Sequence, residues 1–369
     1  MKIISYISRI LIGIVFIFSG AVKAIDPLGT VYKFQDYFLA FNLDFLKFVS
    51  LPLAIILCTS EFLAGISVLF NIRQKAGIWI VMVLMVIFTP LTFILAVTNP
   101  VTDCGCFGDA IHLTNWQTFA KNIILLIPAI FLFITRKAIK PGHGYVREWS
   151  TVAGIALLFL GFILYNLRYL PVIDFLPYKT GTFIPDKMIV PEGMPVNQYE
   201  TTFIYEKDGQ QKEFTLNNYP ADDTTWKFID QRSVLVSKGY QPPIHDLIIT
   251  SMTNDDLTQK ILSSDKYTML MIARKLDEAD NEKLTNGFDL GNYCMAQGID
   301  FYVLTGSGMA EIKKYGTGLP FCLVDETTLK TMIRSNPGFI LMKEGTILGK
   351  WSWANVPVNE QLSEYLLKL

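Results

Sequence analysis

Residues 78–97 read IWIVMVLMVIFTPLTFILAV, a run of twenty residues without a charged side chain. A helix of about 20 apolar residues spans the hydrocarbon core of a bilayer, which is about 30 Å thick. Four further apolar runs occur in the first half of the chain, at residues 3–21, 51–70, 119–135 and 152–167. The whole chain of 369 residues is 51% hydrophobic, with a mean hydropathy of +0.35. The sequence therefore predicts five membrane-spanning helices.

The first run has an alternative interpretation, as a secretory signal, because Lys2 and Arg9 accompany its apolar core. No clean small-x-small cleavage site follows it. As a span, it fits the rule that cytoplasmic connections carry the excess of basic residues. Basic clusters lie at the N-terminus, between the second and third spans and between the fourth and fifth: Lys2, Arg9, Arg73, Lys75, Arg136, Lys137, Lys140 and Arg147. The predicted topology has a cytoplasmic N-terminus and an external C-terminal half.

The connection between the third and fourth predicted spans contains residues 103–109, DCGCFGD. The topology places Cys104 and Cys106 on the outer face. A disulfide across one residue closes a small ring, for which Gly105 supplies backbone freedom, and strained disulfides exchange readily. A redox-active pair and a static disulfide that pins the loop both fit these residues.

The charges near the pair act in opposite directions on the thiol pKa values. Asp103 and Asp109 would raise them by like-charge repulsion. The helix expected to begin at Asn115 or Trp116 would favour a thiolate through its N-terminal dipole.

Three neighbouring features bear on the loop. Residues 26–50 mix aromatic and charged side chains in a pattern typical of an amphipathic helix at the membrane interface. Cys58 lies about two turns inside the second span, either as an additional thiol or as a small buried apolar residue. His112 follows the pair, but zinc sites need a second pair of ligands at suitable spacing. The sequence therefore indicates no metal site.

These residues resemble the DoxX and MauE membrane proteins over about residues 1–135. The motifs are SGAVK at 19–23 followed by Asp26-Pro27, EFLAG at 61–65, the DCGCFGD loop and TNW at 114–116. The resemblance implies a four-helix bundle in the bacterial cytoplasmic (inner) membrane, with the thiol loop facing the periplasm. MauE-type proteins are implicated in supplying or isomerising disulfides for methylamine dehydrogenase with a thioredoxin-like partner, and DoxX-type proteins were linked to quinone oxidation.

A quinone is thus a cofactor that the resemblance suggests, although the residues themselves fix none. Vitamin K epoxide reductase homologues, which also join a bundle to thioredoxin, use Cys-x-x-Cys at a quinone, and this chain has Cys-x-Cys.

Glu61 is an ionisable residue within the second span, where a charge costs at least ~2.5 kcal/mol. Glu61 has two interpretations, a packing and hydrogen-bonding site within the bundle or a proton relay to a redox centre. Lys23, at the end of the first span, can pair with Glu61 only if Glu61 lies close enough to the membrane surface.

The second half of the chain changes character after the fifth span. Residues 171–243 contain spaced prolines and a hairpin signal about Asp208-Gly209, followed by a short helix predicted within residues 224–237. From about residue 244, strands and helices alternate and end in a hairpin and a helix, which predicts an α/β sandwich. The predicted parts are a four-span bundle (1–135), a cytoplasmic loop with the fifth span (136–170), an extended and β-hairpin segment outside the membrane (171–243) and the α/β domain (244–369).

The order of elements in residues 244–369 resembles the thioredoxin fold, in particular its membrane-anchored TlpA-like group. Pro337 occupies the place of that fold's cis-proline, and Asn336 and Pro337 are the predicted edge of a groove for extended polypeptide. The loop after the first long strand departs from the family, because residues 274–280, RKLDEAD, contain no cysteine. Cys294 and Cys322 are expected to be core thiols, and whether they pair is left open.

Two functions fit these features. In the first, the protein is a membrane thiol-disulfide oxidoreductase or electron relay acting on exported proteins through Cys104 and Cys106, with an exported polypeptide or a thioredoxin-like protein as partner. In the second, it is a non-catalytic membrane anchor whose degenerate thioredoxin domain binds other envelope proteins. Transport through the bundle has less support, because Glu61 is the one evident deep charge in the four-span core. A net charge of −1 without a basic face indicates no nucleic-acid partner.

Overall fold

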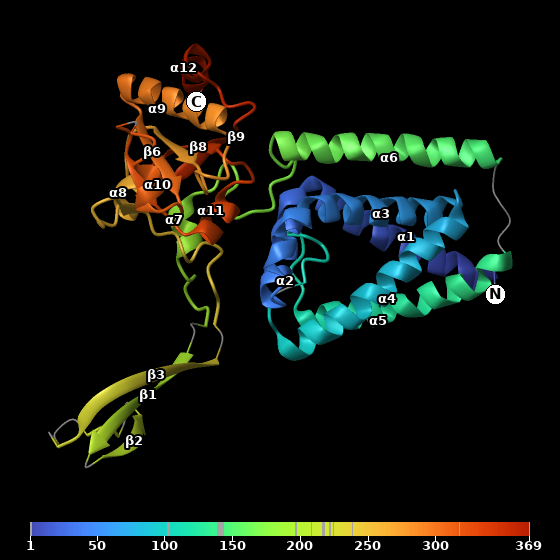
Figure 1. Cartoon of the computed structure of the whole chain (residues 1–369), viewed down its shortest axis with the longest axis horizontal. Coiled ribbons are helices and arrows are strands. Elements are labelled where there is room, and N and C mark those ends of the chain that lie inside the picture. Colours follow the sequence, from blue (N-terminus) through green and yellow to red (C-terminus); the bar gives the residue numbers. More distant parts are fainter. Residues whose placement is uncertain are drawn as a thin grey trace.

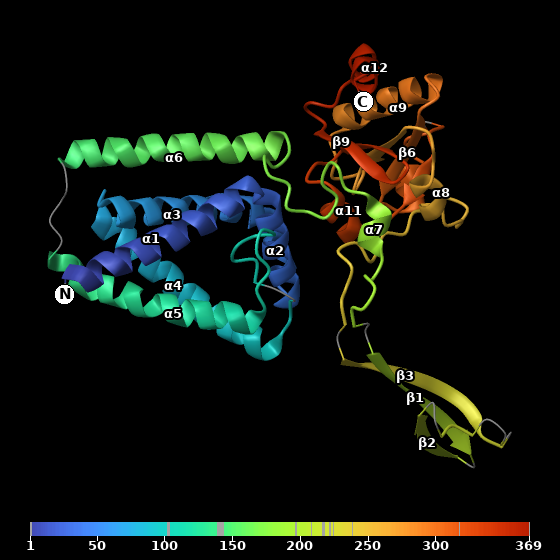
Figure 2. The ribbon, with the colours of Figure 1, turned by 180° about the vertical axis from the view of Figure 1, so that it is seen from behind.

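The computed structural model describes residues 2–101, 104–138, 144–195, 198–207, 209–215, 218–220, 223, 225–237, 239–316 and 318–368. Figure 1 shows a bundle of long helices, an α/β domain beside one end of the bundle, and a small three-stranded sheet that lies apart from both. The view from behind shows the same arrangement, with the α/β domain next to helix α2 (Figure 2).

Five described helices are long and apolar enough to cross a membrane, which agrees with the predicted spans. They are α1 (Lys2–Ile25), α3 (Ser50–Phe70), α4 (Gln74–Thr98), α5 (Asn115–Thr135) and α6 (Tyr145–Arg168). The segment expected at the interface forms α2 (Pro27–Ala40) and a 3-10 helix (Asp44–Val49). Helix α2 crosses the end of the bundle that faces the α/β domain (Figure 1).

Helices α1 and α3 pack closely because glycines remove side chains where their backbones meet. A Cβ on Gly65 would lie 2.6 Å from the Ile17 nitrogen, and one on Gly20 would lie 2.7 Å from the Phe62 nitrogen. Small residues give membrane helices this close approach, where lipid provides no hydrophobic driving force. Helix α6 joins the bundle through Phe159, whose ring stacks on Phe62 with centroids 4.0 Å apart.

We expect Gly65→Ala to destabilise the bundle by about 1–3 kcal/mol, because the added methyl group meets backbone atoms that cannot move aside. Gly154→Ala in α6 is the matched control, since its added Cβ meets nothing within 4 Å. Thermal unfolding of the two variants in detergent measures the difference. Equal melting temperatures would contradict the close-packing account.

The C-terminal sheet has the strand order β4-β7-β6-β5-β8-β9. Strands β5, β6 and β7 are parallel, β8 is antiparallel to β5, and β9 is antiparallel to β8 at the edge of the sheet. The strands are β4 (Thr250–Ser251), β5 (Thr268–Ile272), β6 (Asp300–Thr305), β7 (Phe321–Leu323), β8 (Gly338–Lys343) and β9 (Thr346–Ser352). The β5-α9-β6 unit followed by the β8-β9 hairpin and a terminal helix is a thioredoxin-like fold, as predicted, and the Asn336–Pro337 peptide bond is cis.

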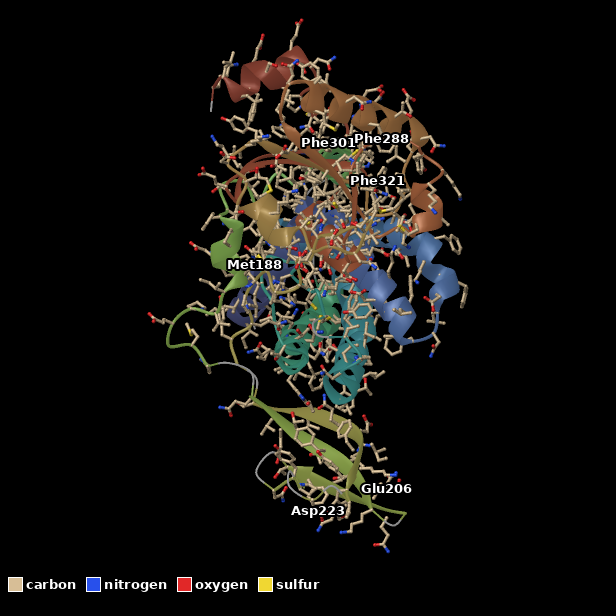
Figure 3. The ribbon with its side chains drawn as sticks, turned by 90° about the vertical axis from the view of Figure 1, so that its left-hand side faces the viewer. Met188, Glu206, Asp223, Phe288, Phe301 and Phe321 are labelled. Atoms are coloured by element: carbon tan, nitrogen blue, oxygen red, sulfur yellow. The ribbon has the colours of Figure 1, made fainter. Side chains whose placement is uncertain are left out.

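Alternate residues of the sheet face two cores. Met269 and Met271 of β5 pack with α9 (Asn281–Ala296) and α12 (Glu360–Leu366), and Leu270 and Ile272 pack with α8 (Thr258–Leu262) and α11 (Glu326–Met332). Figure 3 shows Phe288, Phe301 and Phe321 gathered in the first core. The remaining helices are short, α7 (Ile184–Met188) and α10 (Met309–Ile312).

The three-stranded sheet corrects one prediction. Strands β1 (Gln198–Lys207) and β2 (Gln210–Thr215) form the expected hairpin, although Asp208 of its turn lies outside the described residues. The helix predicted within residues 224–237 is wrong, because Lys227–Ser237 is strand β3, antiparallel to β1. Its aromatic and β-branched side chains favour a pleated surface, and Phe228 packs on Tyr205 across the pair.

Candidate thiol site

The loop that carries the thiols is tied down at both ends. The Asn115 side-chain nitrogen donates to Asn99 Oδ1 and to the Val101 carbonyl, each at 2.8 Å. Thr114 and Gln117 form a reciprocal capping box that starts α5. The loop therefore begins and ends at fixed points at the end of the bundle that faces the α/β domain.

Cys104 and Cys106 lie side by side as free thiols, with their Sγ atoms 3.2 Å apart. Cys104 is buried and Cys106 is half-buried. Gly105 between them has a φ of +65°, and a Cβ there would lie 2.8 Å from Lys33 Cγ. The loop thus needs glycine at this position, both for its left-handed backbone and for the close approach to α2.

Hydrogen bonds from the helices hold the backbone on both sides of Gly105. The Tyr37 hydroxyl of α2 donates to the Cys104 carbonyl at 2.5 Å. The Ser19 hydroxyl of α1 lies 2.8 Å from the Cys106 carbonyl and 2.9 Å from Glu61 Oε2. The SGAVK and EFLAG motifs therefore meet directly beneath the thiol loop.

The pKa values of the two thiols shift in opposite directions. A hydrogen bond from the Cys104 thiol lowers the pKa of Cys106 to about 6 against the opposing effect of burial, and Lys121 and Lys23 lower it further. The same hydrogen bond and burial raise the pKa of Cys104. At neutral pH, Cys106 is thus the thiolate and Cys104 the thiol that keeps its proton.

The carboxylate expected to oppose a thiolate has a cationic partner. Asp109 is bonded to Arg334, with Arg334 Nη2 2.6 Å from Asp109 Oδ2. Asp103 lies outside the described residues. The side chains that lower the pKa of Cys106 most are Cys104, Lys121 and Lys23, and the expected contribution of the α5 N-terminus stays a prediction. Lys121 lies on α5 with its Nζ 4.4 Å from the centre of the Phe107 ring.

Glu61 forms a buried ion pair beneath the loop. Its Oε2 lies 2.7 Å from Lys23 Nζ, which also donates to the Ser19 hydroxyl at 2.7 Å. Two small cavities, each about 40 Å³, flank this group, and both are lined by Glu61, Phe88 and Cys106. Glu61 and the candidate nucleophile therefore face the same spaces.

These cavities test the fit of a quinone. Sites for small organic ligands measure roughly 300–1,000 Å³. A space of about 40 Å³ holds about one water molecule. The two cavities that the described residues form beside Cys106 are therefore too small for a quinone ring.

None of the other cysteines lines the two cavities beside the thiol pair. Cys58 is fully buried among Ala24, Phe159 and Ile163, and lines neither of the two cavities. Cys294 lies in the core beneath α9, and Cys322 in the core on the opposite face of the sheet. The sheet between Cys294 and Cys322 prevents the disulfide that the sequence left open, and both are core thiols, as expected.

The α/β domain docks onto the elements that build the thiol site. Arg334 Nε lies 2.8 Å from Asp26 Oδ2 at the start of α2, in addition to its contact with Asp109 in the thiol loop. Arg274, which follows β5, donates to the Tyr32 hydroxyl of α2 at 2.5 Å. Sequence reasoning missed these contacts, since the partners lie more than 200 residues apart in the chain.

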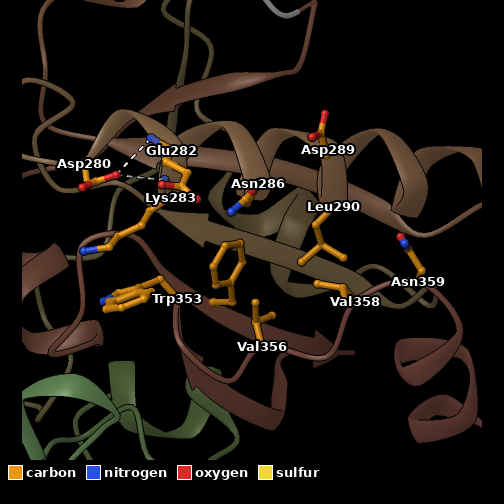
Figure 4. Close-up of a pocket in the computed structure, with 12 residues that line it drawn as sticks. Asp280, Glu282, Lys283, Asn286, Asp289, Leu290, Trp353, Val356, Val358 and Asn359 are labelled. Carbon is orange, nitrogen blue, oxygen red and sulfur yellow. Dashed lines mark hydrogen bonds between the residues drawn. The ribbon is translucent and has the colours of Figure 1, made fainter.

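The predicted groove residues, Asn336 and Pro337, directly precede β8, and Asn336 contacts the loop after β5. Pro337 is buried, and the Asn336 amide nitrogen donates to the Lys275 carbonyl at 3.1 Å. A cavity of about 450 Å³ opens next to them, between the first turns of α9 and the segment after β9 (Figure 4). Its apolar floor is formed by Leu290, Phe339, Trp353, Val356 and Val358, and neither Asn336 nor Pro337 lines it.

Comparisons with known proteins agree with the two parts of this chain. Residues 1–135 match the family model described as methylamine utilisation protein MauE, and residues 199–238 match a domain of unknown function (DUF8463). Protein TlpB of Flavobacterium psychrophilum is 32% identical over 160 residues, which cover 42% of this chain and 43% of that protein. StoA from Bacillus subtilis superposes with a TM-score of 0.26 and 16% identity, over 32% of this chain and 95% of that one.

The matched stretch thus spans less than half of the length of the curated relative. Residues 1–135 are thus similar to the MauE family, and the observed topology of the C-terminal domain is that of a thioredoxin-like fold.

Proposed function

We propose that the protein is a membrane thiol-disulfide oxidoreductase in which Cys106 is the attacking thiolate and Cys104 the resolving thiol. The observation that carries the proposal is the pair of free thiols whose sulfur atoms lie 3.2 Å apart, close enough for one to hydrogen-bond to the other. A thiolate is the nucleophile of disulfide exchange, and an adjacent thiol completes the reaction.

In one direction the Cys106 thiolate attacks a disulfide of a partner protein. One S–S bond of the partner breaks, its first sulfur leaves as a thiolate, and a mixed disulfide with Cys106 forms. Cys104 then loses its proton and attacks Sγ of Cys106, releasing the second partner thiolate. The partner disulfide is reduced by two electrons, and the Cys104–Cys106 pair is oxidised to a disulfide. The reverse sequence oxidises a partner dithiol.

The site is proposed to face the periplasm. The N-terminus, the α3–α4 connection and the α5–α6 connection lie at the end of the bundle away from the α/β domain (Figure 1). These segments carry the basic clusters of the chain, and an excess of basic residues marks the cytoplasmic side. The thiol loop and the α/β domain lie together at the opposite end of the bundle, consistent with an odd number of spans. Exported proteins with thiols or disulfides are therefore the proposed partners, and no nucleic acid is involved.

The test is a trap for the mixed disulfide. Cys104→Ser removes the resolving thiol, so a partner attacked by Cys106 should remain attached to the protein and appear as a reductant-sensitive band of higher mass. Cys106→Ser is the matched control, since it lacks the attacking thiolate. If neither variant shows the reductant-sensitive band, the exchange reaction is contradicted and the second candidate, an anchored binding protein, is favoured.

A further inference from the structure

We propose that Arg334 of the α/β domain is a positioning residue for the membrane thiols, holding the thiol loop and helix α2 in their reactive arrangement. The inference rests on the proposed exchange reaction and adds a function for a thioredoxin-like domain whose described loop after β5 has no cysteines. Arg334 lies two residues before Asn336 and the cis-Pro337 bond.

The Arg334 side chain is almost fully buried, and its three nitrogens all have partners. Nε bonds to Asp26 at 2.8 Å, Nη2 bonds to Asp109 at 2.6 Å, and Nη1 donates to the Lys330 carbonyl at 2.5 Å. A guanidinium presents donors in a fixed planar fork, so it fixes the relative position of the two carboxylates. One side chain of the α/β domain thus joins two separate elements of the membrane domain.

Both of those elements shape the thiol pair. Asp109 belongs to the loop that carries the cysteines, three residues after Cys106. Asp26 caps α2 by accepting a hydrogen bond from the Gly29 nitrogen at 2.9 Å, and α2 provides the Tyr37 hydroxyl that holds the Cys104 carbonyl. Arg334 therefore acts on the thiols through Asp109 on one side and through α2 on the other.

Arg274 supports the same arrangement from the loop after β5. It donates to the Tyr32 hydroxyl on α2, and its guanidinium carbon lies 5.4 Å from the centre of that ring. The guanidinium carbon of Arg334 lies 5.1 Å from the same ring centre. The edge of the fold that carries reactive cysteines in thioredoxin-like proteins here contributes two arginines that contact the elements around the thiols.

Arg334 also neutralises a carboxylate of the thiol loop, since its Nη2 lies 2.6 Å from Asp109 Oδ2. Without the guanidinium, the Asp109 carboxylate would lie unpaired in the thiol loop and disfavour a second negative charge on Cys106. The other charged or titratable groups that face the pair are Lys23 of α1, Lys33 and Tyr37 of α2, Glu61 of α3 and Lys121 of α5, and Cys104 within the pair itself. None of these side chains is changed by a substitution at Arg334.

The test uses the purified full-length protein in detergent and measures the rate of Cys106 alkylation by iodoacetamide as a function of pH. In Arg334→Met we expect the midpoint to rise by about one pH unit, so that the rate at pH 6 falls about fivefold. In the double variant Arg334→Met, Asp109→Asn, the midpoint should return most of the way to that of the unchanged protein, because the second substitution removes the uncompensated carboxylate. A purely structural role would not produce this rescue.

Lys350→Met is the matched control. It removes a second buried cation of the α/β domain, whose Nζ lies 2.5 Å from Asp174 Oδ2 in the segment after α6. Lys350 interacts electrostatically with Arg334 and Asp26, but its described ion pair is with Asp174, so this variant tests whether the loss of any nearby positive charge is sufficient for the shift. An unchanged midpoint in Arg334→Met, or the same shift in Lys350→Met, overturns the proposal. If Arg334→Met does not fold, the same assay is made on Arg334→Lys. We expect a smaller rise of the alkylation midpoint in this variant, which keeps the charge, because an ammonium group lacks the planar fork that bonds both carboxylates.

This assay does not depend on a partner protein. Failure of the proposed exchange would appear as an empty mixed-disulfide trap with normal alkylation profiles. Failure of the Arg334 proposal would appear as unchanged profiles with an intact trap.

Discussion

Replacing Cys104 by alanine is expected to raise the pH midpoint of Cys106 alkylation from about 6 towards about 8.5, the value of an ordinary thiol. The hydrogen bond from Cys104 is the largest cause of the low pKa of Cys106, and alanine cannot donate one. At pH 6 the thiolate fraction would fall from about one half to about 0.3%, a loss of more than 100-fold. Alkylation rates of the full-length protein between pH 5 and pH 9 measure the shift.

The matched control for this prediction is Cys104→Ser. A serine hydroxyl retains a donor at the same place, so its midpoint should lie between those of the unchanged protein and the alanine variant. In the unchanged protein, the rate should fall below pH 6, as the thiolate gains a proton, and should rise little between pH 7 and pH 9. A midpoint that is the same in all three proteins would show that Cys104 does not stabilise the Cys106 thiolate.

Lys23→Met is expected to lower the free energy of unfolding by about 3–5 kcal/mol, because it leaves the Glu61 carboxylate buried without its partner. The two side chains are only 5% and 9% exposed, and they lie where α1 and α3 meet beneath the thiol loop. Unfolding of the protein in mixed micelles, followed by tryptophan fluorescence, measures the loss.

Two further variants make this prediction specific. Lys23→Met combined with Glu61→Leu removes both charges and should be more stable than Lys23→Met alone, because no unpaired charge remains buried. Lys47→Met breaks an exposed pair of the same length, in which Lys47 Nζ lies 2.7 Å from Asp44, and should cost less than about 1 kcal/mol. Losses of equal size in the three variants would contradict a buried, strongly coupled pair.

Local pattern was sufficient to predict the main architecture. The run at residues 78–97 and its four counterparts became α1, α3, α4, α5 and α6, because an apolar helix is the simplest way to satisfy backbone groups in lipid. Alternating strands and helices predicted an α/β sandwich, and the resemblance to the thioredoxin fold implied the cis bond before Pro337. The helix predicted within residues 224–237 failed because strand pairing with β1 decides the conformation of β3.

The thiol site was only partly readable from the sequence. Cys104, Cys106 and Glu61 could be named because two cysteines in a short loop and a charge within a span are unusual locally. Lys121 and Arg334 could not, since their effect depends on how α5 and the α/β domain lie against the loop. A basic residue at the start of a predicted span, such as Lys121, was the one local signal that was available.

The central claim is that Cys104 and Cys106 cycle between dithiol and disulfide. Its most direct test is the redox state of the two thiols in cells, measured by differential alkylation and mass spectrometry before and after a brief pulse of reductant. We expect a mixture of both states that shifts to dithiol during the pulse and recovers afterwards. A pair that stays in one state throughout would contradict the claim.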